Sequence, residues 1–211
     1  MATSKNSIIR LSQYRNALVR MQTLGFVRVF SDNIAEAVGS TAAQVRKDFS
    51  IFAIVGRRRG GYIITELVEK LNTILGKDEV QEVILAGLGN LGQALVTYRG
   101  FEKEGLKIVA CFDINPNKYR ADGALPVMPL DNLKNFVKDR KVKIGIIAVP
   151  DIAAQQVADI MISAGIKGIL NFAPIRLRHN EDCVINNIDV ALELENVIYF
   201  VKASQAASNN R

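Results

Sequence analysis

Three glycines in one short segment have the spacing of a pyrophosphate-binding turn. Residues 83–95 read VILAGLGNLGQAL, in which Gly87, Gly89 and Gly92 form the pattern G-x-G-x-x-G. The first glycine of this pattern permits a tight turn, the second lets the backbone approach a pyrophosphate, and the third allows a helix to pack closely on a strand. The N–H groups at the start of that helix would bind the phosphates. The segment predicts a nucleotide site, which enzymes and sensors use alike.

A carboxylate follows at the distance that such a site requires. Asp113 lies 21 residues after Gly92, close to the spacing of about 20 expected for the group that accepts ribose hydroxyls. Its charge would repel a 2′-phosphate, so NAD(H) is favoured over NADP(H). The alternative is an aspartate that only caps a turn at a strand end. The residues expected to bind the cofactor are Gly87, Leu88, Gly89, Asn90, Leu91, Gly92, Asp113, Lys118, Val149, Pro150, Asn171 and Phe172.

The residues expected beyond the later strand ends are mainly apolar. Val149, Pro150 and Phe172 would favour the neutral ring of NADH over the charged ring of NAD⁺, because an unpaired charge is costly to desolvate. A dehydrogenase also needs an acid or base near the nicotinamide. The only histidine, His179, lies in the polar stretch RLRHNEDC and is expected in a solvated loop. We therefore predict a bound cofactor without a substrate, no catalytic residues and no enzymatic activity.

The net positive charge of the chain comes entirely from its first third. Residues 1–78 contain 12 Lys and Arg against 6 Asp and Glu, whereas residues 79–211 contain 15 of each. A basic module joined to a neutral one suggests that the first meets a polyanion and the second a small ligand.

The basic module has the pattern of a helix-turn-helix. Leu11 to Gly25 predicts an amphipathic helix, and Ser31 is expected to cap a short helix over Asp32 to Val38, after which Gly39 permits a tight turn. Thr41 and the glutamine three residues later form a capping box that starts a third helix.

That third helix has one apolar and one basic side. Val45, Phe49 and Phe52 share the side expected to be buried, opposite Ala43, Lys47 and Ser50. In a major groove, Arg or Lys binds guanine and Gln binds adenine, although a solvated helix face is the alternative. The DNA contacts predicted on this helix are Gln44, Arg46 and Lys47.

A β-hairpin wing is expected next. Gly56 and Gly60–Gly61 bracket three arginines, before the strand-like Tyr62–Ile64. Guanidinium groups at a hairpin tip suit phosphates or a narrow minor groove. These arginines are Arg57, Arg58 and Arg59.

Strands and helices alternate in the remainder, which predicts an α/β fold with a Rossmann-type, doubly wound parallel sheet. Strands are expected over Val80 to Leu85, Leu106 to Asp113, Lys143 to Val149 and Gly168 to Phe172, and helices near Leu130 to Arg140 and over Ile152 to Ala164. A final helix in residues 187–203 is apolar on more than one side and needs a partner. The expected divisions are 1–78 for DNA binding, 79–186 for the cofactor, 187–203 for dimerisation and 204–211 for a disordered tail.

Several classes of protein are disfavoured. No apolar run reaches the roughly 18 residues of a membrane span, and the N-terminus lacks a signal core, so we expect a cytoplasmic protein without membrane contact. Cys111 and Cys183 lack metal-site spacing and are expected to be small buried residues, with a redox thiol pair as the alternative. No metal is expected.

These motifs together resemble the Rex family of bacterial redox-sensing transcriptional repressors. The resemblance covers nearly the whole chain and rests on AQVRKDFSIF, the wing ending GGY, GLGNLG with Asp113, GIIAVP, and GIKGILNFAP. It implies a homodimer with an N-terminal winged helix, a Rossmann domain and an exchanged C-terminal helix. It also implies that NADH lowers affinity for a palindromic double-stranded operator, while NAD⁺ competes for the same site.

The resemblance also suggests residue roles. Arg46 and Lys47 look like the family's base- and phosphate-contacting pair, Arg58 like its wing-tip base, and Tyr98 and Asp189 like a pair that meets across the dimer. The family often has Arg where this chain has Asn16, next to Arg15, and a Gly after two basic wing residues where this chain has a third Arg. Without the resemblance, Tyr98 would be a core aromatic and Asp189 a helix N-cap.

Three other functions remain open at this stage. The first is an NAD-dependent oxidoreductase with an accessory DNA-binding module. The second is a regulator that senses another nucleotide or a CoA-type ligand on the same fold. A structural scaffold is the third, but it would require neither the arginine-rich wing nor the phosphate turn.

Overall fold

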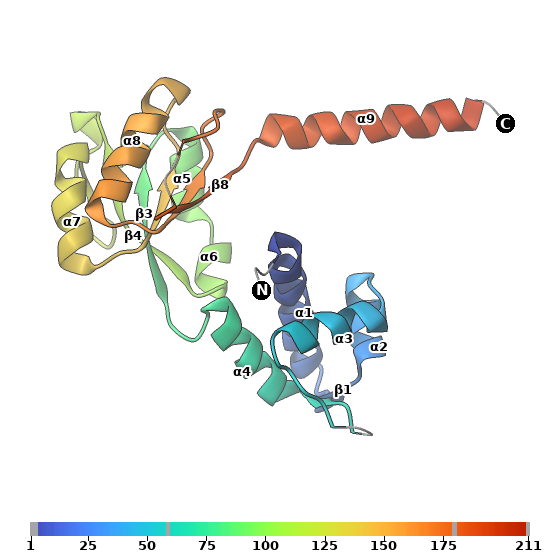
Figure 1. The fold of residues 1–211 in the computed structure, drawn as a ribbon. Helices are drawn as coiled ribbons and strands as arrows, with labels where there is room; N and C mark the ends of the chain where they lie inside the picture. The colour runs from blue at the N-terminus through green and yellow to red at the C-terminus, as the bar shows by residue number, and fades with distance from the viewer. Residues whose placement is uncertain (1–3, 58–59, 179–180, 210–211) are drawn as a thin grey trace. The chain divides into compact units, whose positions relative to one another are not determined.

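The computed structural model describes residues 4–57, 60–178 and 181–209, which form two compact units, residues 1–80 and 81–211 (Figure 1). The predictions for Arg58, Arg59 and His179 fall outside the described residues.

The first unit is a small helical domain with a two-stranded sheet. Its elements are α1 (Lys5–Thr23), β1 (Arg28–Val29), α2 (Ser31–Val38), α3 (Ala42–Ile51), β2 (Tyr62–Ile63) and α4 (Ile64–Leu75). β1 pairs antiparallel with β2. At the centre of its core the ring of Phe49 packs edge-on against both Tyr14 and Tyr62. This core holds α3 against α1 and the base of the wing.

Two starts of helices differ from the prediction. α1 begins at Lys5, six residues before Leu11, because the Ser4 side chain accepts a hydrogen bond from the Ser7 N–H and caps the helix. The expected cap at Ser31 is wrong: Ser31 is the first residue of α2 and is buried. The Phe30 N–H instead donates to the Asn33 side chain at 3.0 Å. Gly39 ends α2 at φ +64°, as expected.

The third helix has the two predicted sides. Thr41 caps it by accepting the Gln44 N–H at 3.1 Å. The predicted capping box is only half formed, because the Gln44 side chain donates to Asp48 and not to the Thr41 backbone. Val45 and Phe49 are buried, while Arg46 and Lys47 are exposed on the other side.

The second unit is a doubly wound sheet of six parallel strands in the order β5-β4-β3-β6-β7-β8, which confirms the predicted fold class. Its strands are β3 (Gln81–Ala86), β4 (Leu106–Asp113), β5 (Val127–Pro129), β6 (Ile144–Ile147), β7 (Gly168–Asn171) and β8 (Val184–Asn187). Its helices are α5 (Asn90–Thr97), α6 (Gly100–Lys103), α7 (Leu133–Arg140), α8 (Asp151–Ala164) and α9 (Val190–Asn209), with 3₁₀ turns η1 (Pro116–Lys118) and η2 (Leu130–Asn132).

Alternate residues of β3 serve the two faces of this sheet. Ile84 packs in a cluster with residues of α7 and α8, whereas Val83 and Leu85 pack with residues of α5 and α6. The helices therefore cover both faces, and the carboxyl ends of the parallel strands are left for a ligand. The sequence did not predict β5 and β8, and Val80 lies outside β3.

The last helix runs further than expected. α9 continues to Asn209, beyond residue 203 where the dimerisation helix is expected to end. The alanines of this segment favour a helix. Large apolar side chains of α9 remain exposed in the single chain, including Leu194 at 60% and Phe200 at 68%. Such a surface needs a partner, and its exchange between subunits stays a prediction.

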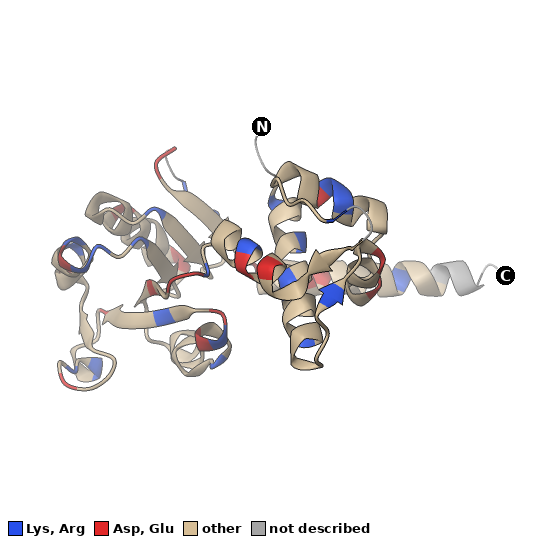
Figure 2. Cartoon of the chain, turned by 90° about the horizontal axis from the view of Figure 1, so that it is seen from below, with Lys and Arg blue, Asp and Glu red and all other residues tan. Residues whose placement is uncertain are grey.

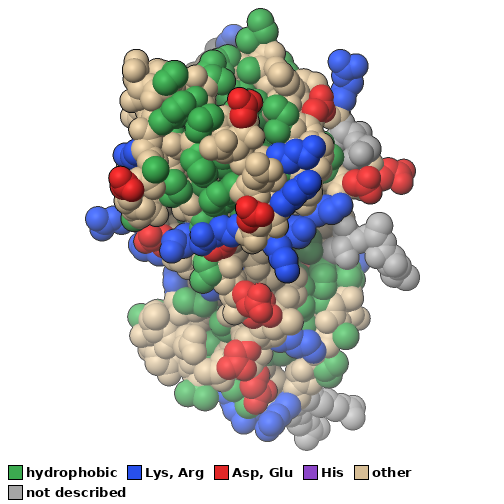
Figure 3. All heavy atoms as spheres, turned by 90° about the vertical axis from the view of Figure 1, so that its left-hand side faces the viewer, with side chains coloured by type: hydrophobic (Ala, Val, Ile, Leu, Met, Phe, Trp, Pro, Cys, Tyr) green, Lys and Arg blue, Asp and Glu red, His purple; other side chains and the backbone are tan. Residues whose placement is uncertain are grey.

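Charged side chains are distributed differently in the two units. Lys and Arg lie on several helices of the first unit, and both signs are interspersed in the second (Figure 2). Basic side chains also gather on the face shown in Figure 3. In the second unit, α7 exposes Lys134 and Lys138. Within the described ranges no helix is long and apolar enough to cross a membrane, and no three His, Cys, Asp or Glu side chains are grouped to hold a metal ion.

Candidate cofactor and DNA sites

The phosphate turn depends on Gly87. This residue has φ +93°, and its N–H donates to the Phe112 carbonyl at 2.8 Å. A Cβ at Gly87 would collide with the carbonyl of Ala148 at the end of β6. Only glycine therefore lets the chain leave β3 here and pass close to the neighbouring strand.

The other two glycines have different surroundings. A Cβ at Gly92 would collide with the Gly87 carbonyl oxygen, so this glycine lets α5 pack against the turn itself more than against the strand. Among the described residues, and apart from its two chain neighbours, no atom lies within 4 Å of a Cβ at Gly89, which has an extended backbone with φ −76°. The open space lies at the start of α5, where the first N–H groups have no acceptor within the helix. This region suits a phosphate.

Asp113 organises the same turn. Its carboxylate accepts the Leu88 N–H at 2.7 Å, the Asn115 N–H at 2.9 Å and the Lys118 ammonium at 3.0 Å. Burial acts to raise the pKa of Asp113, but the two backbone donors and Lys118 hold it below its usual range. Asp113 therefore does cap the turn at the end of its strand, as the alternative interpretation predicted. A carboxylate has about four acceptor positions, so three bonds leave room for a ribose hydroxyl.

A cavity of about 490 Å³ lies beyond the strand ends next to this turn. Of the predicted cofactor residues, those lining it are Gly87, Gly89, Asp113, Lys118, Val149 and Pro150. Leu88, Asn90, Leu91, Gly92, Asn171 and Phe172 are not among its described lining residues. Phe172 is half-buried and packs against the core on one face of the sheet, so its contact with the cofactor stays a prediction.

Asn171 has an internal task. It is fully buried, and its amide nitrogen donates to the carbonyls of Ala173 and Ile175 and to the Asn187 side chain. These bonds fix the chain after β7 and join it to β8. Several apolar residues that line the cavity were not predicted from the sequence. Of these, Ile114 follows directly from the rule that ligands lie beyond strand ends. Ala153, Gln156 and Val157 come from α8 and carry no such signal.

The candidate DNA surface joins the third helix to the wing. Arg46 of α3 and Arg57 of the wing line one hollow of about 260 Å³, together with Phe30, Asp32 and Tyr62 among others. The Arg57 N–H donates to the Gly61 carbonyl at 2.9 Å and closes the base of the wing. The structure therefore brings two of the predicted DNA contacts together.

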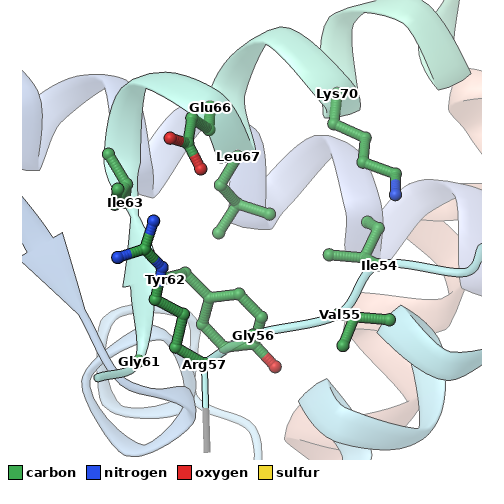
Figure 4. Close-up of a pocket in the computed structure, with 10 residues that line it drawn as sticks. All are labelled: Ile54, Val55, Gly56, Arg57, Gly61, Tyr62, Ile63, Glu66, Leu67 and Lys70. Carbon is green, nitrogen blue, oxygen red and sulfur yellow. The ribbon is translucent and has the colours of Figure 1, made fainter.

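A second hollow, of about 250 Å³, lies between the base of the wing and α4. Figure 4 shows the Arg57 guanidinium and the Glu66 carboxylate on the same side of this hollow, with Tyr62 beside Gly56. A Cβ at Gly56 would lie 2.7 Å from the Tyr62 ring, so the glycine permits this packing. Lys70 donates to the Ala53 carbonyl at 2.6 Å and ties α4 to the segment before the wing.

A buried carboxylate beneath the third helix was not predicted from the sequence. Asp48 is 0% exposed and accepts both Nε and Nη2 of Arg10, each at 2.6 Å. It also accepts the Tyr14 hydroxyl at 2.9 Å and the Gln44 amide at 3.0 Å. Burial acts to raise the pKa of Asp48, but these donors, with Arg10 the strongest, hold it below its usual range. An acidic residue within a basic helix was the only available signal.

Comparison with known proteins identifies the family. A "Redox-sensing transcriptional repressor Rex" from Desulforamulus reducens is 44% identical over 90% of both chains, and one from Desulfitobacterium hafniense is 41% identical over 95% of this chain and 96% of the other. This chain belongs to the Rex family.

The chain is also similar to solved structures and matches two family models. A crystal structure of RSP with β-NAD⁺ and operator DNA matches with a TM-score of 0.92, at 34% identity over 99% of this chain and 97% of the other. RSP with β-NADH matches with a TM-score of 0.85, at 33% identity over the whole of both chains. A CoA binding domain model matches residues 78–175, and a model for a putative DNA-binding protein N-terminus matches residues 2–50.

Two residues singled out by the Rex resemblance lie in the second unit. Tyr98 is 59% exposed and packs edge-on against Phe101, so it is not a core aromatic. Asp189 caps α9 by accepting the Leu192 N–H at 3.1 Å, as its helix-capping alternative predicted. In α1, Asn16 accepts a bond from Arg15, whose Nε donates to Asn72 at 2.9 Å.

Proposed function

We propose that this Rex-family chain is a transcriptional repressor that senses the ratio of NADH to NAD⁺. It binds a palindromic operator as a homodimer when NADH is low and releases it when NADH binds. The observation that carries this proposal is the presence, in one chain, of a phosphate turn beside a cavity and a basic winged helix. The similarity to RSP bound to β-NAD⁺ with operator DNA, and to RSP bound to β-NADH, supports it.

The cofactor would occupy the cavity beyond the strands. The open space at Gly89 and the start of α5 fit the pyrophosphate, and the free acceptor position of Asp113 fits the ribose. The bound dinucleotide would supply a ring whose charge reports the redox state. Val149 and Pro150 would favour the neutral ring of NADH, because they offer no partner to a positive charge. Leu88, Asn90, Leu91 and Gly92 would shape the turn, and Asn171 and Phe172 would support the strand ends.

DNA contacts would come from α3 and the wing. Gln44, Arg46 and Lys47 would enter the major groove, and Arg57, Arg58 and Arg59 would meet phosphates or the minor groove. Exchange of α9 would form the dimer, with Tyr98 and Asp189 near the interface. NADH must then bind the DNA-incompatible arrangement more tightly, and a 100-fold preference corresponds to about 2.7 kcal/mol.

We also propose that the protein is cytoplasmic and does not turn over its cofactor. Among the described residues that line the cavity, Asp113 and Lys118 are the only titratable groups, and they are paired with each other. NADH oxidation is measured with a panel of carbonyl substrates, and we expect no rate above the background. Turnover that is abolished by Asp113→Asn would favour an oxidoreductase with an accessory DNA-binding module.

A CoA-type ligand is the second candidate, because the family model that matches residues 78–175 is described as a CoA binding domain. Native mass spectrometry of the purified protein identifies the ligand it carries, and calorimetry then compares NADH, NAD⁺ and CoA. We expect NADH to bind most tightly and CoA not to compete. Retention of CoA and competition by CoA would overturn the NADH proposal.

A further inference from the structure

The buried Asp48 contacts a residue on the candidate DNA-reading surface. Its Oδ1 accepts the amide of Gln44 at 3.0 Å and Nη2 of Arg10 at 2.6 Å. Its Oδ2 accepts the hydroxyl of Tyr14 at 2.9 Å and Nε of Arg10 at 2.6 Å. The two oxygens therefore divide their partners: Gln44 depends on Oδ1 alone, and Tyr14 on Oδ2 alone.

This division fixes the orientation of the Gln44 amide. An ionised carboxylate can only accept hydrogen bonds, so Gln44 must turn its NH₂ group, and not its carbonyl, toward Asp48. Arg10, which pairs with both carboxylate oxygens, keeps the acid ionised. The Gln44 side chain, at the start of α3, retains its carbonyl oxygen and its second N–H for another partner. Neither the sequence pattern nor the position of Gln44 reveals this constraint.

We propose that Asp48 is a positioning residue that locks the Gln44 amide for reading adenine. The inference rests on the proposed binding of operator DNA by α3. Adenine presents an acceptor at N7 and a donor at N6 in the major groove, which match the free N–H and carbonyl of a glutamine. Guanine presents two acceptors, so the amide carbonyl would face an acceptor there. Because the hydrogen bond to Asp48 fixes the Gln44 amide before DNA binds, contact with adenine does not carry the entropic cost of fixing it.

The alternative is that Asp48 only stabilises the domain. A structural role would lower the affinity for every DNA sequence together, because it changes the folded fraction or the position of the whole helix. A positioning role changes the ratio of affinities between sequences. This ratio does not depend on the fraction of active protein, so it separates the two roles.

The test measures the affinity of the full-length dimer for an operator and for versions with each half-site adenine replaced in turn by guanine and by cytosine. Gln44→Ala identifies the position it reads, where the wild type should prefer adenine by roughly 5- to 150-fold, the range of one good bidentate contact. Asp48→Asn should lose most of that preference and retain the preferences at other positions. Tyr14→Phe is the matched control, because it removes a donor to Oδ2 and leaves Oδ1 with Gln44. It should keep the full preference.

A double-mutant cycle completes the test. In the Gln44→Ala background, Asp48→Asn should cause no further change in the ratio of affinities for adenine and guanine.

If Asp48→Asn does not fold, Gln44→Glu serves instead. A carboxylate cannot donate to Asp48, so the base preference should move from adenine toward cytosine, whose N4 is a donor. An unchanged preference for adenine in Asp48→Asn or Gln44→Glu would overturn the inference while leaving operator binding intact. Failure of the wild type to bind any operator would instead overturn the proposed function, and the inference with it.

Discussion

Gly89→Thr should separate cofactor binding from folding. Gly89 has an extended backbone that any residue adopts, and apart from its chain neighbours no atom of the described residues lies within 4 Å of an added Cβ. It is also the N-cap of α5, a position where threonine and glycine are about equally favourable. The free energy of unfolding should therefore change by less than about 0.5 kcal/mol. The new side chain would fill the space proposed for the pyrophosphate, and its hydroxyl would compete for the N–H groups of the first turn.

The expected loss of NADH affinity is at least 100-fold, or about 2.7 kcal/mol. Calorimetric titration measures the affinity, and urea unfolding followed by circular dichroism measures the stability. The matched control is Gly92→Ala, whose Cβ would collide with the Gly87 carbonyl oxygen. This overpacking should cost about 1–3 kcal/mol of stability. Wild-type NADH affinity in Gly89→Thr, or a loss of stability equal to that of Gly92→Ala, would refute the reasoning.

Three further predictions concern the described side chains. Arg46→Ala should weaken operator binding, measured by fluorescence anisotropy, by about 1–3 kcal/mol and leave the NADH affinity, measured by calorimetry, unchanged. Loss of both affinities in a folded variant would contradict the proposal that DNA and NADH bind at separate sites. The pKa of Asp48 lies below its usual range, so its ionisation should stabilise the fold above about pH 4, and this contribution should disappear as the pH falls through the folded-state pKa. The urea concentration at the midpoint of unfolding, measured over a range of pH, should show this loss in the wild type and a smaller loss in Asp48→Asn. Equal pH profiles for the two proteins would contradict the contribution of Asp48. Burial raises the pKa of Cys111 to about 11 and also raises the pKa of Cys183, so a thiol reagent at pH 8 should react slowly until urea is added; fast labelling of native protein would show accessible thiolates.

The sequence predicts the parts of the fold that local chemistry controls. The range of β4 agrees with the prediction, because a long apolar run ends at the charged Asp113. The short β5 and the polar β8 were missed, since their strand conformation depends on pairing with β4 and β7 and not on their own composition. The extent of α9 was underestimated because its last turns lack the apolar pattern that marked its beginning.

The candidate site divides in the same way. The glycine turn and Asp113 could be predicted because each depends on backbone geometry close to it in the sequence. Phe172 and Val149 both follow a strand, and only the packing of the completed sheet places Val149 at the cavity and packs the half-buried Phe172 against the core. The bonds from Arg10 to Asp48 join residues 38 positions apart, and no spacing rule predicts such a pair.

The most direct test of the account is the affinity of the full-length protein for a palindromic operator, titrated with NADH and with NAD⁺ at one fixed salt concentration. The salt must be fixed because phosphate contacts make the affinity strongly dependent on it. We predict that saturating NADH weakens binding by about 100-fold, equivalent to about 2.7 kcal/mol, and that NAD⁺ alone leaves it intact and restores it by competition. Operator affinity that is the same with and without saturating NADH would contradict the proposed coupling.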